Sequence, residues 1–515
     1  MNTMRRRIIQ YQNRQLHKFG GSSLSDIKCY KRVAGIIKKY SEPGDLIVVS
    51  AAGTTTNQLI NWLKFSKINH HLASKVQESI RSYQENLIIG LLSKKKANLL
   101  KFNFLSDFTH LCSLLNKPID NYIYSEIVGH GEIWSARLMS AVLEEFGISS
   151  QWLDARLFLR AEHSSHPEID EIASRPLLEK HLQKYYNKRL VMTGFIAKSK
   201  KGQTVLLGRN GSDYSATQVG ALTGVKKITI WSDVAGIYSA DPHKVKDAYL
   251  LPFLRFDEAS ELARLAAPVL HARTLQPISF TNIDLQFRCS YDPNKGSTKI
   301  ARMLESATDV KIITSHDNVC LIEVILFKYQ NFLQTYKKIN LFFKKNQICP
   351  LAERVKLKNQ LIQFCYTKEV AYNVMCNLNK VGLVKKISLR DRFSLVAIVG
   401  AGICKNSLYK DCFYQNLKDQ PVEFFWHSKE NISLVAVLST NKTLYLVRKL
   451  HQSLLLLKKH FKLILFDKSN INFCYLILLH SYKKLFCFII FIKIVLYKNV
   501  IVFKLIQINC VINYY

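Results

Sequence analysis

Apolar runs of strand length alternate with longer amphipathic stretches in the N-terminal part of the chain. Leu16–Phe19 and Leu46–Ser50 are such runs, and a segment of helix length separates them. In Ile123–Leu143 apolar residues recur at helical spacing, within a mostly helical segment, 57–175. Further strands are predicted at Leu190–Ile196, Thr204–Leu207, Lys227–Trp231 and Leu285–Cys289. Strands that alternate with helices predict a parallel α/β sheet.

The pattern changes from about residue 309, where half-buried strands alternate with helical stretches. Strands are predicted at Val310–Thr314, Val319–Ile325, Leu361–Tyr366, Phe393–Val399, Val422–Trp426 and Ser433–Leu438, and helices at 328–345, 367–381 and 441–456. Two copies of a small β-α-β-β-type unit explain this order. Nothing in this part of the sequence indicates catalysis, so regulation or dimerisation is predicted for it.

Two glycine-rich turns each follow an apolar run and precede a segment of helix-forming sequence. The first is Lys18–Ser23, before a helix predicted from Leu24 to Tyr40, and the second is Gly208–Ser215, before Ser215–Leu222. Such a turn exposes backbone N–H groups, which favour anions. The first turn carries a Lys and the second an Arg and an Asp. An enzyme that binds a phosphorylated nucleotide and a small charged co-substrate is therefore predicted.

Composition excludes several other classes of protein. The net charge of +35 is spread along the chain mostly as Lys, without a basic and aromatic stripe, so nucleic acid is not a predicted partner. The twelve Cys show no metal-ligand spacing, which predicts free thiols in a reducing cytoplasm and no metal ligands. Arg5–Arg7 precedes no apolar run, so residues 1–13 are predicted to be a disordered tail rather than a signal peptide.

The C-terminal tail, residues 461–515, contains no Gly, Ala or Pro. Within it, Leu485–Phe503 has the length of a membrane span but includes Lys493 and Lys498. A charge at the centre of a membrane helix costs about 2.5–3.5 kcal/mol on insertion scales. A degenerate coding sequence explains the missing small residues better than a membrane anchor does, so no membrane association is predicted.

Five motifs, taken together, resemble the aspartokinase family in their order and spacing. They are Lys18–Ser23, Val49–Gly53, Gly129–Glu132, Gly208–Ser215 and Trp231–Pro242. The resemblance covers residues 14–457 and is strongest to the kinase half of the methionine-linked bifunctional aspartokinase–homoserine dehydrogenases. It implies an amino-acid kinase three-layer α/β sandwich over 14–303, followed by paired ACT-like α+β regulatory domains over 309–457.

The resemblance also implies an activity. The expected reaction converts ATP and L-aspartate to ADP and 4-phospho-L-aspartate, the first step towards methionine, threonine and lysine, with Mg²⁺ bound through the nucleotide phosphates. A cytoplasmic homodimer or homotetramer, assembled through the ACT-like domains, is expected. The competing hypothesis is a non-catalytic remnant that only dimerises. A glutamate or carbamate kinase is disfavoured because two of these motifs, Gly129–Glu132 and Gly208–Ser215, occur together.

For the nucleotide phosphates, the resemblance implies Lys18 as the catalytic cation and the N–H groups of Gly20, Gly21 and Ser22 as ligands. The alternative for Lys18 is a solvated side chain at a strand end. Ser232, Asp233 and Tyr238 match the loop that binds adenine and ribose, and core packing is the alternative for the tyrosine.

For the aspartate, Arg209 matches the residue that binds a substrate carboxylate, a task that suits the two-pronged guanidinium. Asp213 would order that loop or orient the substrate amine, with a helix N-cap as the alternative. Glu132 matches a glutamate near the amine, and a solvated loop residue is its alternative. Ser50 and Thr56 match substrate-side hydroxyls, or they are plain turn residues.

Departures from the family pattern bear on activity. His243 replaces an arginine, and Pro268 replaces a phosphate-binding lysine for which Arg264 and Arg273 are the candidate substitutes. Where the dehydrogenase dinucleotide loop would begin, its three glycines are replaced by Asp467, Ser469 and Asn472. Homoserine dehydrogenase activity is therefore predicted to be absent, and 461–515 is expected to be the remnant of a lost domain.

Overall fold

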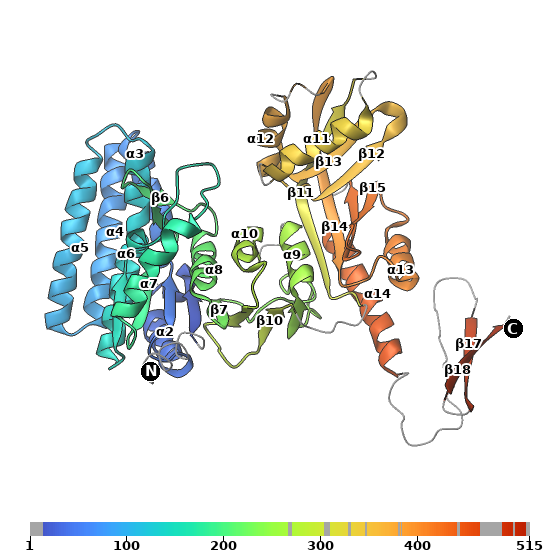
Figure 1. Ribbon diagram of the computed structural model, residues 1–515, viewed down its shortest axis with the longest axis horizontal. Helices are drawn as coiled ribbons and strands as arrows, with labels where there is room; N and C mark the ends of the chain where they lie inside the picture. The colour runs from blue at the N-terminus through green and yellow to red at the C-terminus, as the bar shows by residue number, and fades with distance from the viewer. Residues whose placement is uncertain are drawn as a thin grey trace.

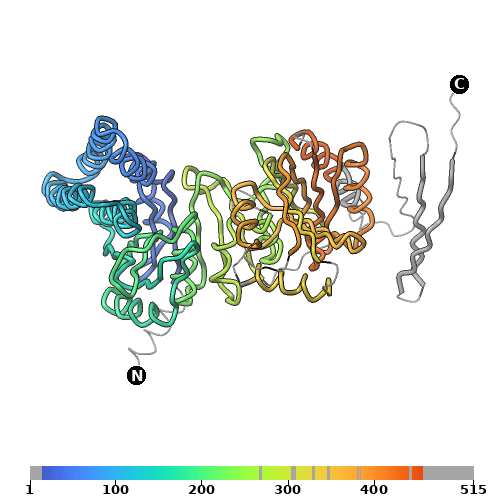
Figure 2. Tube along the Cα trace, turned by 90° about the horizontal axis from the view of Figure 1, so that it is seen from above, coloured from blue at the N-terminus to red at the C-terminus, as the bar shows by residue number. Residues whose placement is uncertain are grey.

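The computed structural model describes residues 14–265, 270–302, 309–327, 331–345, 348–379, 382, 384–439, 443–463, 487–497 and 500–510. The predicted tail 1–13, Pro268 and the three residues that replace the dehydrogenase glycines lie outside these ranges. Figures 1 and 2 show two bodies side by side along the long axis, the first built from 14–302 and the second from 309–463.

The first body is built on an eight-stranded sheet in the order β3-β4-β2-β1-β7-β9-β10-β8. Neighbouring strands are parallel except β9 and β10. The strands are β1 (Gln15–Phe19), β2 (Leu46–Val49), β3 (Ser150–Leu153), β4 (Arg189–Thr193), β7 (Lys227–Ser232), β8 (Phe253–Arg255), β9 (Asp284–Cys289) and β10 (Ser297–Ala301). A small hairpin, β5 (Ile196–Lys198) and β6 (Thr204–Leu206), stands beside the sheet.

Helices cover both faces of this sheet. Successive residues of β2 point to opposite faces, so Leu46 and Val48 join one buried cluster and Ile47 and Val49 the other. The second cluster is covered by α2 (Ile27–Tyr40), α3 (Thr55–Ser66), α4 (His70–Leu91), α5 (Lys94–Leu114) and α6 (Asn121–Glu145); the first by α7 (Glu171–Lys184), α8 (Gly211–Thr223) and α9 (Phe256–Arg264). This arrangement is a three-layer α/β sandwich.

Short elements complete the first body. They are η1 (Gly21–Leu24), η2 (Ala155–Leu157), α10 (Ala272–Leu275) and η3 (Gln276–Ile278). The prediction that 57–175 is mostly helical is confirmed by α3 to α6, although β3 and η2 lie between the end of α6 at Glu145 and the start of α7 at Glu171. The helix after the first glycine turn begins later than predicted, at Ile27, where Asp26 caps its N-terminus.

The second body is a six-stranded antiparallel sheet in the order β12-β13-β11-β14-β16-β15. Its elements are β11 (Ile312–Ile325), α11 (Phe332–Lys345), β12 (Ala352–Lys356), η4 (Leu357–Asn359), β13 (Leu361–Thr367), α12 (Lys368–Asn379), β14 (Lys386–Val399), α13 (Ser407–Leu417), β15 (Val422–His427), β16 (Ser433–Leu438) and α14 (Thr443–Leu463). Buried clusters place α11 and α12 on one part of the sheet and α13 and α14 on the other.

The second body divides into two units, here called the first and second regulatory units. The long strands β11 and β14 run through both of them. The first unit uses the second half of β11, then α11, β12, β13, α12 and the start of β14. The second unit uses the rest of β14, then α13, β15, β16 and α14, and its fourth strand is the beginning of β11. The predicted break between Val310–Thr314 and Val319–Ile325 is therefore wrong: one strand continues, with a register irregularity between His316 and Val319.

A buried carboxylate joins the two bodies. Glu258 on α9 is fully buried, and its side chain accepts hydrogen bonds from the Lys311 ammonium at 2.7 Å and the Ala401 N–H at 3.0 Å. One turn along α9, Glu261 accepts from the Ser433 hydroxyl. Arg264 donates to the carbonyl of Leu351 at 2.8 Å. Because burying a charge costs free energy unless it is paired, these contacts fix α9 on the regulatory sheet.

In the tail, β17 (Cys487–Tyr497) pairs antiparallel with β18 (Val500–Cys510), a hairpin that the sequence analysis did not predict. Among the helices that the structure describes, none combines the length and apolarity needed to cross a membrane. The boundaries of the tail and of the two larger domains stay predictions.

Removal of the Glu258 carboxylate should destabilise the protein strongly. In Glu258→Ala the Lys311 ammonium would remain largely buried without its partner. We expect the free energy of unfolding, measured by urea denaturation, to fall by about 3–5 kcal/mol. Asp257→Asn is the control, because Asp257 pairs with Arg255 at the surface and such pairs contribute only about 0–1 kcal/mol. Equal losses in the two variants would contradict this account of the interface.

Candidate functional site

Apart from Arg209, the predicted site residues gather around the carboxyl ends of three adjacent parallel strands, β2, β1 and β7. Open α/β sheets bind their ligands at this edge. The loops leaving the strands are held together by backbone bonds: Ser50 N–H donates to the Phe19 carbonyl at 3.1 Å, and Gly20 N–H donates to the Trp231 carbonyl at 3.4 Å.

Lys18 and Asp213 form an ion pair that joins the two glycine turns. Lys18 lies two residues after Leu16 on β1, so its side chain points to the same face as Leu16, towards α8. Asp213 is in the first turn of α8. Lys18 is only 8% exposed, so the alternative of a solvated lysine is wrong. The N-cap alternative for Asp213 is also wrong, because Asn210 occupies the cap position.

Glycine is required where the first turn meets the loop after β2. A Cβ atom at Gly21 would lie 2.9 Å from the Ala51 carbonyl oxygen, and the Gly21 carbonyl accepts a hydrogen bond from Gly53 N–H at 3.0 Å. A Cβ atom at Gly20 would lie 3.6 Å from the Lys18 ammonium nitrogen. The bare backbone of this turn thus lies next to the Lys18 charge, with Ser22 exposed beside it.

Glu132 reaches the same place from α6. Its neighbour Gly131 lets the helix approach the loop after β2, since a Cβ there would lie 2.9 Å from that of Ala51. One carboxylate oxygen, Oε1, accepts from Ala51 N–H at 3.3 Å, and the other, Oε2, is buried with no hydrogen-bond partner among the described residues. The alternative of a solvated loop glutamate is therefore wrong. Burial raises the pKa of Glu132 to about 8, although the nearby Lys18 opposes this shift.

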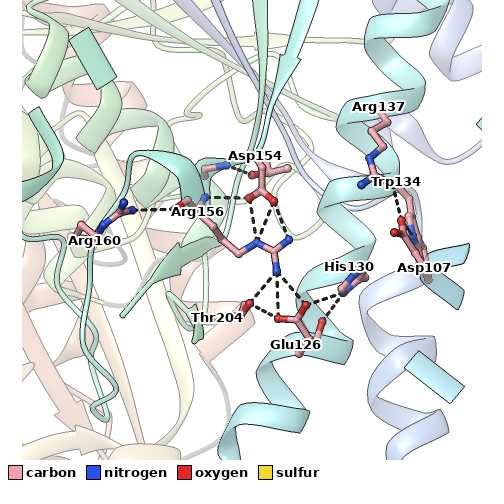
Figure 3. A network of polar contacts seen from close by, with 11 residues as sticks. Asp107, Glu126, His130, Trp134, Arg137, Asp154, Arg156, Arg160 and Thr204 are labelled. Atoms are coloured by element: carbon pink, nitrogen blue, oxygen red, sulfur yellow. Dashed lines mark hydrogen bonds and ion pairs between the residues drawn. The ribbon is translucent and has the colours of Figure 1, made fainter. Parts of the chain in front are cut away.

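A partly buried ion network holds α6 in position (Figure 3). The Arg156 guanidinium lies between two carboxylates, Asp154 at 2.7 Å and Glu126 of α6 at 3.1 Å, and it also donates to the Thr204 hydroxyl of β6 at 2.9 Å. His130 Nδ1 lies 2.7 Å from the Glu126 carbonyl oxygen. Desolvation is the main cause that lowers the pKa of His130, so the imidazole stays neutral. The network ties the helix that carries Glu132 to the hairpin leading into the second glycine turn.

Ser50 and Thr56 both lie at this edge and are half-buried. Ser50 directly follows β2, and Thr56 is in the first turn of α3. The adjacent Thr55 is fully buried, and its hydroxyl donates to the Ala52 carbonyl. Of this Thr-Thr pair, Thr56 is therefore the more accessible.

Arg209 is not brought to Lys18 and Glu132. Its flanking residues Gly208 and Asn210 have left-handed backbone conformations, with φ of 77° and 56°. The guanidinium instead lies 3.2 Å from Glu369 on α12 of the first regulatory unit, and these side chains are 79% and 77% exposed. The second glycine turn thus has a strongly turned backbone at Arg209, whose side chain extends towards the first regulatory unit.

Arg273 has a structural role that the sequence analysis did not predict, since it was considered there only as a substitute for the phosphate-binding lysine. It is buried, donates hydrogen bonds to the carbonyls of Leu207 and Pro167, and lies over the Tyr214 ring at 4.3 Å. It therefore braces both ends of the second glycine turn. Phe195 was also missed: its φ of 65° is unusual for a bulky residue and brings it against Gly211. Arg273 is engaged in these contacts, and Arg264 in its hydrogen bond to the Leu351 carbonyl. Neither guanidinium is therefore free to take the place of the phosphate-binding lysine.

The predicted nucleotide residues lie on the loop after β7. The Ser232 hydroxyl is 3.1 Å from the Val234 carbonyl, Asp233 is exposed, and Tyr238 is half-buried. His243 is exposed further along the loop, and its backbone N–H donates to the Asp241 carboxylate.

Ser290 and Tyr291, which directly follow β9, connect the first glycine turn to the end of β7. The sequence analysis did not predict a role for either residue. The Ser290 hydroxyl is 2.7 Å from that of Ser23 and donates to the Ser232 carbonyl at 3.0 Å. The Tyr291 hydroxyl donates to the Ser22 carbonyl at 2.9 Å. The available signal in the sequence was a Ser-Tyr pair directly after a predicted strand, where polar side chains reach the carboxyl edge of the sheet.

Comparisons with known proteins agree with this geometry. Residues 13–288 match the Amino acid kinase family. Over 461 residues the chain is 57% identical to the bifunctional aspartokinase/homoserine dehydrogenase 2 of Escherichia coli strain K12, covering 90% of this chain and 57% of that protein. It is 31% identical over 333 residues to the chloroplastic bifunctional aspartokinase/homoserine dehydrogenase 1 of Arabidopsis thaliana, covering 60% of this chain and 35% of that protein.

Solved structures share the fold. E. coli aspartokinase III in complex with aspartate and ADP has a TM-score of 0.77 at 22% identity, covering 86% of this chain and 100% of that one. Clostridium acetobutylicum aspartate kinase has a TM-score of 0.67 at 18% identity, covering 85% and 100%. The predicted fold class, an α/β sandwich followed by a sheet-rich regulatory region, is confirmed.

The chain belongs to the amino acid kinase family. Within that family it is similar to the aspartokinase part of the bifunctional aspartokinase/homoserine dehydrogenases, as the motifs predicted. It spans 57% of the length of the E. coli relative and 35% of the Arabidopsis relative.

Glu132 should make stability depend on pH. Its folded-state pKa of about 8 exceeds the ordinary value of 4.5, so between these pH values the folded protein keeps a proton that the unfolded chain releases. The free energy of unfolding should therefore fall as pH rises, by up to about 1.4 kcal/mol per pH unit from this group.

We expect Glu132→Gln to remove this contribution, so that the variant gains stability over the wild type as pH rises from 5 to 8 in urea denaturation. Glu145→Gln is the control: hydrogen bonds from Ser93 lower the pKa of Glu145, so it titrates below this range. A constant difference between wild type and Glu132→Gln across the range would contradict the raised pKa.

Proposed function

We propose that this chain is an aspartate kinase, which transfers the γ-phosphoryl group of ATP to the side-chain carboxylate of L-aspartate. The observation that carries the proposal is the Lys18–Asp213 ion pair, because it holds a cation between the two glycine turns, beside a buried and half-satisfied Glu132. The names of the similar proteins, which include aspartokinase, support the same reaction.

On the nucleotide side, the N–H groups of Gly21 and Ser22 face the phosphates, whereas the predicted Gly20 N–H is already donated to the Trp231 carbonyl. The loop after β7, with Ser232, Asp233 and Tyr238, receives the ribose and adenine. Mg²⁺ enters with the nucleotide and is held by phosphate oxygens in this proposal. Among the residues that the structure describes, no group of three or more His, Cys, Asp or Glu side chains could hold a metal ion.

On the aspartate side, the unpartnered oxygen of Glu132 accepts the substrate ammonium. That positive charge would favour the ionised carboxylate and offset the cost of its burial. Arg209 leaves Glu369 and binds the substrate α-carboxylate. Since both ends of that ion pair are largely exposed, breaking it costs at most about 1 kcal/mol. The Ser50 and Thr56 hydroxyls complete this side of the site.

The reaction itself needs positioning and charge neutralisation. An oxygen of the substrate side-chain carboxylate attacks the γ-phosphorus, a P–O bond forms, and the bond to the ADP oxygen breaks. In the loose transition state, negative charge spreads over the phosphoryl oxygens. Lys18, held in place by Asp213, neutralises that charge without having to reorganise. No proton transfer is required, because the attacking group is already ionised.

Several finer points belong to the same proposal. The product would feed methionine, threonine and lysine synthesis in the cytoplasm, and the regulatory units would join chains into a dimer or tetramer. The replacement of three glycines by Asp467, Ser469 and Asn472 supports the absence of homoserine dehydrogenase activity.

A coupled assay tests the function directly. ADP release is followed with purified protein, MgATP and L-aspartate, and hydroxylamine traps the acyl phosphate as the aspartyl hydroxamate. We expect ADP and hydroxamate to form in equal amounts, with L-glutamate as the control substrate giving neither. ADP without hydroxamate would contradict aspartate kinase activity, and formation of neither would support the non-catalytic alternative.

Lys18→Ala should reduce turnover by about 10²–10³-fold, because loss of one preorganised donor typically costs about 2.7–4 kcal/mol of transition-state stabilisation. Lys31→Ala is the matched control, since Lys31 is an exposed lysine on α2. The coupled assay measures both variants, and circular dichroism checks their folding. Near-normal turnover in folded Lys18→Ala would remove Lys18 from the mechanism.

Arg209→Lys should raise the KM for aspartate much more than the KM for ATP, because lysine keeps the charge but cannot bind a carboxylate through two parallel bonds. Glu369→Gln is the companion variant: it releases Arg209 from its present partner and should leave the KM for aspartate unchanged or slightly lower. A rise in the KM for ATP alone would assign the second glycine turn to the nucleotide instead.

A further inference from the structure

The nucleotide loop continues into the core of the second regulatory unit. The chain leaves the kinase sheet after Ser232, and beyond Tyr238 the side chains of Ala240 and Val245 are buried in the cluster that contains Leu446 and Leu450 of α14. The segment that follows the proposed adenine site therefore packs as part of the regulatory unit, although the sequence assigns it to the kinase.

Ser239 is the centre of this contact. The residue is 2% exposed, and its hydroxyl lies 2.9 Å from Nε2 of His451, which is also 2% exposed, on α14. The same hydroxyl accepts from Tyr249 N–H at 3.1 Å. The Ser239 carbonyl accepts from Ile313 N–H of β11 at 2.8 Å. Ser239 is thus fixed by two elements of the second regulatory unit, one through its side chain and one through its backbone.

Two further contacts hold the same segment. The Arg448 guanidinium of α14 donates to the Lys244 carbonyl at 2.7 Å. The Lys244 ammonium lies 3.9 Å from Asp317 of β11, whose carboxylate also accepts from the Thr443 hydroxyl at the start of α14. The loop is therefore attached to α14 at both ends of residues 239–244.

We propose that His451 is a positioning residue for nucleotide binding, acting through Ser239 on the adjacent Tyr238 and the loop back to Ser232. The inference rests on the proposed function, since it needs the loop after β7 to be the nucleotide loop. A buried polar group that loses its partner costs about 1–3 kcal/mol. The loop without the His451 contact would relax from its bound conformation, so the effect should fall on the nucleotide and not on aspartate.

The first regulatory unit provides a contrast within the same chain. Its contact with the active site is the exposed Arg209–Glu369 pair on the substrate loop. The two units thus touch different loops, and a variant in one unit serves as a control for the other.

The test compares MgADP affinity, measured by isothermal titration calorimetry, with the KM values of the full-length protein. We expect His451→Leu to weaken MgADP binding and to raise the KM for ATP, each by about five- to tenfold, with the KM for aspartate within about twofold of wild type. His451→Gln, which keeps a hydrogen-bonding group, should restore much of the affinity. Glu369→Gln and Gln452→Ala, an exposed neighbour on α14, should leave MgADP binding unchanged.

A double-mutant cycle separates positioning from general destabilisation. Ser239→Ala removes the other half of the same contact. The double variant, Ser239→Ala with His451→Leu, should therefore bind MgADP about as weakly as whichever single variant has the lower affinity. Additive losses, equal changes in both KM values, or unchanged MgADP affinity in folded His451→Leu would overturn the proposal.

Calorimetry keeps this proposal separate from the proposed function. A wild-type protein that binds MgADP but forms no aspartyl phosphate would contradict the kinase reaction, and the effect of His451 on affinity would still decide the inference. A wild-type protein that binds no nucleotide would overturn both.

Discussion

The ion pair between Lys18 and Asp213 is the contact on which the rest of the site depends. It exists because β1 and α8 pack against each other, with Lys18 at the end of one and Asp213 in the first turn of the other. Through it, a turn suited to phosphates and a turn suited to a small charged substrate share one buried cation. The glycine at 21 and the ion network around Arg156 serve the same end, since they let the loop after β2 and α6 approach this cation.

The regulatory body is joined to the kinase body by contacts of different strength. The fully buried Glu258 anchors α9 to the regulatory sheet, and the chain then continues towards Arg273, which braces the substrate turn. The second unit encloses the segment after the loop that follows β7, whereas the first unit contacts the second glycine turn through the exposed Arg209–Glu369 pair. Buried contacts therefore fix the loop after β7, and a weak surface contact borders the second glycine turn.

The sequence predicted the features that depend on local patterns. Apolar runs located β1, β2 and β7, and the glycine turns located Lys18 and Asp213, because turn chemistry is written in neighbouring residues. It missed His451 and the bracing contacts of Arg273, because both arise from packing between segments distant in the chain. The sequence analysis also predicted two separate strands on either side of the polar residues 316–318. In the structure β11 is one strand, because it pairs with β14 on both sides of these residues. The sequence analysis missed α13 as well, where Tyr409, Phe413 and Leu417 at helical spacing were an available signal.

Oxygen transfer from the substrate carboxylate to phosphate tests the central claim most directly. L-aspartate labelled with ¹⁸O in its side-chain carboxylate is incubated with the protein, MgATP and hydroxylamine in unlabelled water, and the released phosphate is analysed by mass spectrometry. Attack by the carboxylate on the γ-phosphorus makes a labelled oxygen the bridge of the acyl phosphate, and hydroxylamine then releases it with the phosphate. The account predicts one ¹⁸O atom in each phosphate released. Unlabelled phosphate would mean that water attacks ATP, and would contradict it.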